Sequence, residues 1–313
     1  AHTNRLNLSQ ISDAKLKHYL FLLTAVFLLA ACGQGPGKNL EVDLNDVDVG
    51  ELQISPETMN DIIQNIASPI EVAALINDLN IPYSTRYLAD PESLSTNTTS
   101  FEMAYSLGAL IADLGYLNMY EKTGTAVNFL SSINSLADAL QIGQFFDYAT
   151  IERLAISSSD QDSLMFISVN SFNNMDDYLR ETERSNLSAL MIAGVWIEGL
   201  YLATQVAEQN SIEDLKSMIG EQKLILNDLL LILNNYKDEE AIERYIKDLE
   251  QIKSIYDDVK ISYEVGEPQT IEKDGMLMVI QSESSNVSMS DETLRKIIEV
   301  TEQIRNIHMN IKA

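Results

Sequence analysis

Apolar residues recur with helical spacing over most of the chain from residue 99 onward. The pattern is clearest in 212–262, where apolar residues repeat at intervals of three and four on both sides of the polar stretch 234–238. Two amphipathic helices joined by a short polar segment predict a long antiparallel helical hairpin, packed like a coiled coil. The same spacing predicts helices at 100–121, 125–141, 147–156, 160–183, 186–208, 212–235, 238–262 and 290–312.

Other stretches depart from this pattern. Residues 82–100 are polar and interrupted by proline, which predicts a long loop. Within 264–289, the Asp-Gly pair at 274–275 separates two short stretches, which predicts a minor β-hairpin near the C-terminus. Ser-Pro pairs at 55–56 and 68–69 are typical helix starts. The predicted fold class is therefore all-α, a helical bundle with one small β-hairpin.

A weak internal repeat relates two of the predicted helices. Residues 107–117 ("LGALIADLGYL") and 192–202 ("IAGVWIEGLYL") align at an offset of 85 residues, and Asp113 then matches Glu198. Amphipathic helices also look alike by chance, so both two repeated helical units and a coincidence stay open. Each segment is apolar on nearly all sides and rich in small residues, so we expect both at the centre of the bundle.

The two matching acids lie in the middle of these apolar helices. A carboxylate in such a place must be paired, hydrogen-bonded or neutral, because burying it alone is very costly. One interpretation is structural: each acid bonds to a tyrosine, an arginine or a free backbone amide. The other is functional: the acids form a carboxylate pair at the floor of a pocket between helices, for acid–base chemistry or cation binding. The candidate pocket residues are Asp113, Glu198, Tyr116, Tyr201 and Trp196.

The sequence lacks the residues and motifs that other kinds of chemistry need. No P-loop, dinucleotide fingerprint or EF-hand spacing occurs, and no Ser–His–Asp set can be assembled. After residue 31 the only histidine is His308, which we expect to be a solvated or half-buried helix residue. We therefore expect no catalytic residue, no metal site and no cofactor. The alternative that stays open is a calcium ion bound by acidic residues.

The net charge excludes one class of partner. The chain of 313 residues carries 47 acidic and 21 basic side chains, a formal charge of −26. Nucleic-acid binding depends on Lys and Arg that neutralise phosphates, so no nucleic-acid partner is expected. The same charge opposes adhesion to anionic lipid, so membrane binding would need an anchor of another kind.

A short apolar segment lies near the start of the sequence. Residues 19–31 carry no charge, follow Lys15 and Lys17, and are too few to span a bilayer, which takes about 20 apolar residues. A basic stretch, a short apolar stretch and a small-residue end are typical of a secretory signal. Residues 1–14 contain Asp13 and begin with Ala, so we expect the natural start elsewhere and leave them out of the fold.

The end of this segment, Leu29-Ala30-Ala31-Cys32, resembles the lipobox of bacterial lipoproteins. The resemblance implies cleavage before Cys32 and a diacylglycerol on its sulfur, and Gly33 implies the outer membrane. Buried acyl chains contribute about 0.8 kcal/mol per CH₂, enough for an anchor. Whether the protein would face the periplasm or the outside stays open. The alternative is an ordinary signal peptide with an incidental cysteine.

These features divide the chain into three parts. Residues 1–31 are the signal peptide with upstream residues, and 32–54 are the lipidated cysteine with a flexible acidic linker. Residues 55–313 are the helical domain, which would divide at 55–184 and 185–313 if it has two lobes.

Three stretches of this domain resemble a group of uncharacterised helical envelope lipoproteins of diderm bacteria: "SLGALIADLGYLNMY", "SALMIAGVWIEGLYLA" and "SDETLRKIIEVTEQIRNI". The group has no assigned activity, so the resemblance implies the fold and the anchor only. We expect a lipid-anchored envelope protein that acts as a non-catalytic binding or scaffold module for an envelope protein or a small ligand. The alternative is a carboxylate-dependent hydrolase or cation-binding protein that uses Asp113 and Glu198. A purely structural spacer would differ from the first in having no pocket.

Overall fold

The computed structural model describes residues 76, 79, 81–157, 161–210, 212–265, 269–273, 276–280 and 283–309, without the side chains of 123, 154–165 and 264–284. All of these belong to one compact unit, Glu41–Ala313. The predicted signal segment, Cys32, the linker and the two Ser-Pro helix starts lie outside the described residues.

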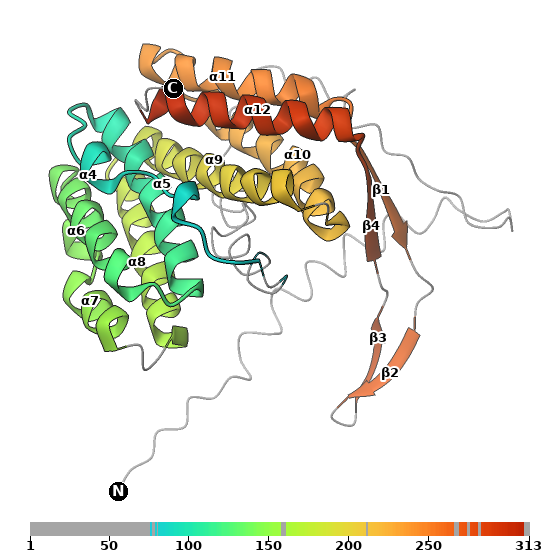
Figure 1. Cartoon of the computed structure of the whole chain (residues 1–313), viewed down its shortest axis with the longest axis horizontal. Coiled ribbons are helices and arrows are strands. Elements are labelled where there is room, and N and C mark those ends of the chain that lie inside the picture. Colours follow the sequence, from blue (N-terminus) through green and yellow to red (C-terminus); the bar gives the residue numbers. More distant parts are fainter. Residues whose placement is uncertain are drawn as a thin grey trace, which may run out of the picture. The chain divides into compact units, whose positions relative to one another are not determined.

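Helices dominate the described chain, which confirms the all-α prediction (Figure 1). The helical elements are η2 (Thr85–Tyr87), α4 (Pro91–Leu94), α5 (Ser100–Met119), α6 (Thr123–Ala139), η3 (Gly143–Phe145), α7 (Tyr148–Ser157), α8 (Gln161–Glu181), α9 (Ser185–Gln209), α10 (Glu213–Asn234), α11 (Glu240–Tyr256) and α12 (Asp291–His308). The strands are β1 (Lys260–Val265), β2 (Gln269–Lys273), β3 (Met276–Ile280) and β4 (Glu283–Ser288).

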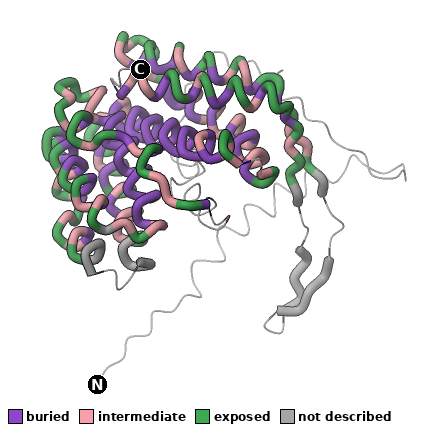
Figure 2. Tube along the Cα trace, viewed as in Figure 1, coloured by how far each residue is buried: buried purple, intermediate pink, exposed green. Residues whose placement is uncertain are grey.

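Helix α9 is the central element. It packs against α5, α8, α10 and α12, and nearly every residue from Leu187 to Val206 is buried (Figure 2). Among the described residues α9 is the one helix long and apolar enough to cross a membrane, and all of its most apolar stretch is buried inside the protein. Length and composition of this kind are also those of a soluble core helix, and they give little evidence of a membrane span.

Helices α5 and α9 form the most extensive helix pair, and two glycines set their distance. A Cβ on Gly108 of α5 would lie 1.9 Å from the carbonyl oxygen of Met191 on α9. A Cβ on Gly194 of α9 would lie 2.0 Å from the carbonyl oxygen of Tyr105 on α5. The contact is thus reciprocal, and the backbones approach so closely that neither position has room for a side chain.

Local capping residues explain several helix starts. The Thr99 side chain accepts a hydrogen bond from the Glu102 N–H, and the Glu102 carboxylate accepts one from the Thr99 N–H, a capping box for α5. Asp90 caps α4, which has Pro91 in its first turn. The predicted loop 82–100 is therefore wrong in detail, because it contains η2 and α4.

Three helices are followed by a residue other than glycine in the left-handed conformation. Glu121, Gln141 and Glu183 follow the last residues of α5, α6 and α8 with φ of 54°, 59° and 60°. After α5 the Lys122 N–H donates to the Leu117 carbonyl at 2.9 Å, which is the bond of a Schellman motif. Glycine usually takes this position, so the sequence did not mark these ends.

The predicted hairpin of two long helices is present as α10 and α11. Its antiparallel pairing is fixed near the open end, where the Tyr256 hydroxyl donates to the Ile219 carbonyl at 2.8 Å. The predicted helix 238–262 is too long: α11 ends at Tyr256, and β1 begins at Lys260. Residues up to 262 keep an apolar spacing that also fits a strand, so the pattern alone did not mark the change.

The strands form two antiparallel pairs nested in the sequence. β2 pairs with β3, with Lys273 opposite Met276, where the sequence predicted a hairpin; the Asp-Gly pair itself lies outside the described residues. β1 pairs with β4, which the sequence analysis did not foresee, with Ile261 opposite Val287. Gly220 of α10 makes room for this pair, because a Cβ there would lie 2.4 Å from Cγ1 of Val287.

Candidate functional site

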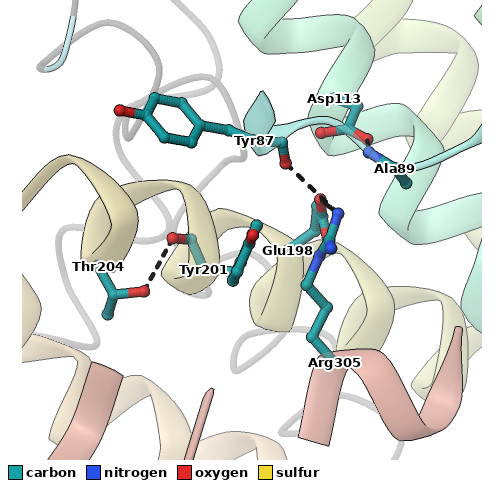
Figure 3. A network of polar contacts seen from close by, with 7 residues as sticks. All are labelled: Tyr87, Ala89, Asp113, Glu198, Tyr201, Thr204 and Arg305. Carbon is teal, nitrogen blue, oxygen red and sulfur yellow. Dashed lines mark hydrogen bonds and ion pairs between the residues drawn. The ribbon is translucent and has the colours of Figure 1, made fainter. Parts of the chain in front are cut away.

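A buried charged cluster joins three helices at the centre of the protein (Figure 3). Asp113 comes from α5, Glu198 from α9 and Arg305 from α12. Asp113 and Glu198 are fully buried, and Arg305 is 3 % exposed. The structure therefore brings together the two acids that the repeat pattern matched, and it adds an arginine that the sequence analysis did not name.

Glu198 and Arg305 form a two-pronged ion pair. Arginine Nε donates to Oε2 at 2.6 Å and Nη2 donates to Oε1 at 2.7 Å, the fork geometry that makes such pairs strong. Tyr201 packs its ring against the guanidinium, 3.9 Å from Cζ to the ring centre. Burial opposes the charge of Arg305, but the Glu198 carboxylate outweighs it and raises the pKa of Arg305 above its ordinary value.

Asp113 is held differently. Its Oδ2 accepts the Ala89 N–H at 2.9 Å. Burial, and after it the negative charge of Glu198, raise the pKa of Asp113 well above its ordinary value, which favours the neutral carboxylic acid. Its Oδ1 has no hydrogen-bond partner. A proton on Oδ1 would make it a donor, and the neighbouring Glu198 side chain would be the acceptor.

The Glu198–Arg305 pair compensates its own two charges. With Asp113 in its favoured neutral form, the cluster buries no uncompensated charge. The partners, a backbone amide for Asp113 and an arginine for Glu198, are two of the partner types named by the structural interpretation of the sequence. With Arg305 already against Glu198, a cation would meet a positive charge at this place.

The other three candidate residues have separate surroundings. Tyr201 belongs to the charged cluster through Arg305. Tyr116 lies about one turn along α5 from Asp113, and its hydroxyl accepts the Ser84 N–H at 3.0 Å. Trp196 donates from Nε1 to the Gln222 side chain at 2.9 Å, at the contact between α9 and α10. All three are buried, so they pack within the core.

An irregular segment covers the cluster, and we call residues 81–90 the strap. Asp113, Tyr116 and Tyr120 lie at intervals of three and four on one face of α5, and all three bind main-chain groups of the strap. Arg305 reaches it as well, from Nη2 to the Tyr87 carbonyl at 3.4 Å (Figure 3). We call these four residues the polar stripe.

Neither Arg305 nor the strap was predicted to belong to the site. Arg305 had a detectable signal, because it lies seven residues after Ile298 and four after Thr301, on the buried face of α12. The hydrogen bonds of the strap left no signal in the sequence, because they are made by main-chain groups, which every residue except proline carries in full. Its aromatic residues Tyr83 and Tyr87, whose rings lie against Tyr116, were the detectable part.

A second polar group lies beside the cluster. The His308 ring stacks on Tyr245 with centroids 4.1 Å apart, and its Nε2 is 2.9 Å from the Asp248 carboxylate. The ring of Tyr105 of α5 lies beside both, with its centre 5.3 Å from His308 and 5.1 Å from Tyr245. Burial lowers the pKa of His308, with Asp248 opposing that shift. The expected half-buried helix residue thus ties the end of α12 to α11 and α5.

Within the described ranges, no group of three or more His, Cys, Asp or Glu side chains is placed to hold a metal ion. No protein-family model matches the chain. No curated protein and no solved structure matches it either. The function is therefore inferred from the residues and their geometry.

Proposed function

We propose that the chain is a lipid-anchored envelope protein whose helical domain serves as a non-catalytic binding or scaffold module. The anchor would be Cys32, and the support for it is the lipobox-like sequence that ends at this residue. The location that follows is the outer membrane. A partner would be an envelope protein or a small ligand that reaches the domain from the aqueous side.

The observation that favours a non-catalytic role is the closed state of the charged cluster. A catalytic acid must reach a substrate, and here both acids are fully buried and bonded to groups of the protein itself. Their partners come from α12 and from the strap, so the acids connect segments that are far apart in the sequence. This is the arrangement of a structural polar network, which fixes how helices pack.

The second candidate is a carboxylate-dependent hydrolase or cation-binding protein that uses Asp113 and Glu198. One observation favours it: two buried carboxyl groups lie close enough for the charge of Glu198 to raise the pKa of Asp113, as in the acid–base pairs of enzymes. Against it, Arg305 occupies the position beside Glu198 that a cation or a substrate would need.

Anchoring is tested by expressing the chain in a diderm bacterium with a palmitate analogue that can be tagged. We expect the wild-type chain and the linker control Gln34→Ala to carry the tag and to sediment with the outer membrane. We expect Cys32→Ser to lose both. A tagged Cys32→Ser chain, or an untagged wild-type chain, would contradict the anchor.

The binding role and its rival are separated in two further steps. Chemical crosslinking of the anchored wild-type chain in cells should recover a specific envelope component, and failure to recover one removes the main content of the proposal. Calcium is the probe for the rival. If calcium raises the melting temperature of the wild-type chain but not of Glu198→Gln, the carboxylates bind a cation and the rival replaces the proposal.

A further inference from the structure

The strap is held as a bound peptide would be held. Three side chains of α5 bind its main chain: the Tyr120 hydroxyl donates to the Ile81 carbonyl at 2.5 Å, Tyr116 accepts the Ser84 N–H, and Asp113 accepts the Ala89 N–H. All three bonds go to backbone groups, which a peptide of another sequence would also offer. The rings of Tyr83 and Tyr87 add contacts with Tyr116, at 5.7 and 6.5 Å between ring centres, so the strap is held by main-chain bonds and by two aromatic side chains.

The strap also has the side-chain pattern of a ligand in a groove. Ile81, Tyr87 and Ala89 are buried, and Tyr87 is 4 % exposed. Between and beside them, four strap residues are exposed: Pro82, Thr85, Arg86 and Asp90. Buried anchors separated by exposed residues are the usual form of a peptide that binds through its main chain and a few pockets.

The polar stripe would be costly without an occupant. If the strap left, Asp113 and Tyr116 would lose their backbone donors, and Arg305 would lose the Tyr87 carbonyl. A buried polar group without a partner destabilises a protein by about 1–3 kcal/mol. The stripe therefore needs either the strap or another segment that presents the same groups.

We propose that the polar stripe (Asp113, Tyr116, Tyr120 and Arg305) is a binding site for an extended peptide segment of a partner protein, and that the strap occupies this site in cis. The inference rests on the proposed binding function, for which it names the class of partner and a form of regulation. The strap is the competitor that a partner segment must displace.

Attachment to the same chain makes the strap a strong competitor. A tethered segment has an effective concentration of about millimolar, so a free peptide at micromolar concentration would rarely replace it. A partner that is itself concentrated at the membrane, or one that binds through more anchors, would displace it. The site would then be closed until the partner is near.

The test uses a labelled peptide with the strap sequence, IPYSTRYLAD, and fluorescence anisotropy with the purified full chain in mild detergent. The variant Ala89→Pro removes the N–H that Asp113 accepts, and Leu88, at φ −79° and ψ 147°, already has the extended conformation that precedes proline. We expect this chain to bind the peptide at least tenfold more tightly than the wild type. The matched control Ala89→Gly keeps the N–H and should bind like the wild type.

A second peptide tests the role of the main chain. N-methylation at the position of Ala89 removes the same N–H from the ligand, and we expect at least a tenfold loss of binding to the Ala89→Pro chain. Equal binding of the peptide by all three chains, or indifference to N-methylation, would overturn the inference.

Hydrogen exchange on the wild-type chain gives a result even where Ala89→Pro fails to fold. Peptide in excess over the effective concentration of the strap, about millimolar, should accelerate exchange of the strap amides, Ser84 and Ala89 among them, and leave α9 unchanged. Unchanged strap exchange overturns the inference. If the chain crosslinks to an envelope partner but binds no peptide, the proposed function stands and this site is ruled out. If the chain binds the peptide but crosslinks to no envelope partner, the site stands and the proposed function is ruled out.

Discussion

Helices α5 and α9 each carry an acid and a tyrosine at matching positions of one face, and these side chains bind different partners. On α5, Asp113 and Tyr116, together with Tyr120 at its C-terminal end, bind the main chain of the strap. At an offset of 85 residues, α9 has Glu198 and Tyr201, and their partner is Arg305 on α12. Two similar faces are therefore covered by an irregular segment in one case and by a helix in the other.

The two acids also have different electrostatic surroundings. Glu198 faces a guanidinium, and the ion pair compensates for its burial. Asp113 faces one backbone amide, and burial with the negative charge of Glu198 raises its pKa, which favours the protonated form. The acids lie at matching positions of two similar helices, so their surroundings are set by the neighbours that the fold supplies and not by position along the helix.

Glu198→Gln should have the largest effect, because it leaves the buried Arg305 without its main counter-charge. We expect the free energy of unfolding to fall by about 3–5 kcal/mol in urea. Asp113 can offset part of this loss by ionising, so adding Asp113→Asn should cost more than the two single changes together. A loss below about 1 kcal/mol for Glu198→Gln would show that the pair is not what stabilises α12.

The glycine contact tests whether the two helices are equivalent where their backbones meet. Gly108→Ala and Gly194→Ala each push a Cβ into a backbone carbonyl of the other helix, so each should destabilise by at least about 3 kcal/mol. Gly124→Ala is the matched control, since a Cβ there meets nothing within 4 Å, and it should stabilise α6 by up to about 1 kcal/mol. Thermal unfolding of the three variants measures both effects. Unequal losses of stability for Gly108→Ala and Gly194→Ala would contradict a reciprocal contact.

Asp113→Asn should change the pH dependence more than the stability at neutral pH. Asparagine keeps an acceptor for the Ala89 N–H and a donor for Glu198, and it needs no proton. The raised pKa of Asp113 means that its contribution is fully present below the unfolded-state pKa of about 3.9 and is lost as pH rises through the folded-state value. We expect the variant to be as stable as the wild type, or up to about 1 kcal/mol more stable, at pH 8. Urea titrations from pH 5 to 9 check this. A steeper pH dependence in the variant than in the wild type would contradict a protonated Asp113.

The helix ends give the smallest effect and a further contrast. Helix α5 is followed by Glu121 in a left-handed conformation, whereas α9 is followed by Asn210 in an extended conformation. The Asn210 side chain donates to the Val206 carbonyl. Glu121→Gly should therefore raise the free energy of unfolding by about 0.5–1 kcal/mol. Asn210→Gly should lower it slightly, because it removes that bond. Melting temperatures resolve changes of this size in opposite directions.

The sequence predicts the helices of this protein because their periodicity is a property of neighbouring residues. It also places Asp113 and Glu198 on central helices, since each lies among apolar residues on all sides of its helix. The sequence does not predict which group each acid bonds to. Arg305 is 107 residues from Glu198, and the Ala89 amide differs in no chemical way from other backbone amides. The β1–β4 pair was not predicted for a related reason, because Lys260 and Ser288 pair across the whole β2–β3 hairpin that lies between them in the sequence.

In a chain that is exported unfolded, as a secretory signal would imply, helix α9 would meet a lipid bilayer before it meets its neighbours. Its 25 residues are long and apolar enough for a translocation channel to release them sideways into the membrane, and the domain could then not fold. A charged side chain at the middle of such a segment opposes that insertion by about 2.5–3.5 kcal/mol. In such a chain Glu198 would keep α9 out of the membrane during export and would become an ion-pair partner after folding. Membrane-integration assays of residues 185–209, with Glu198 intact and as Glu198→Leu, would measure this: integration should be low in the first and high in the second, and equal integration would rule the role out.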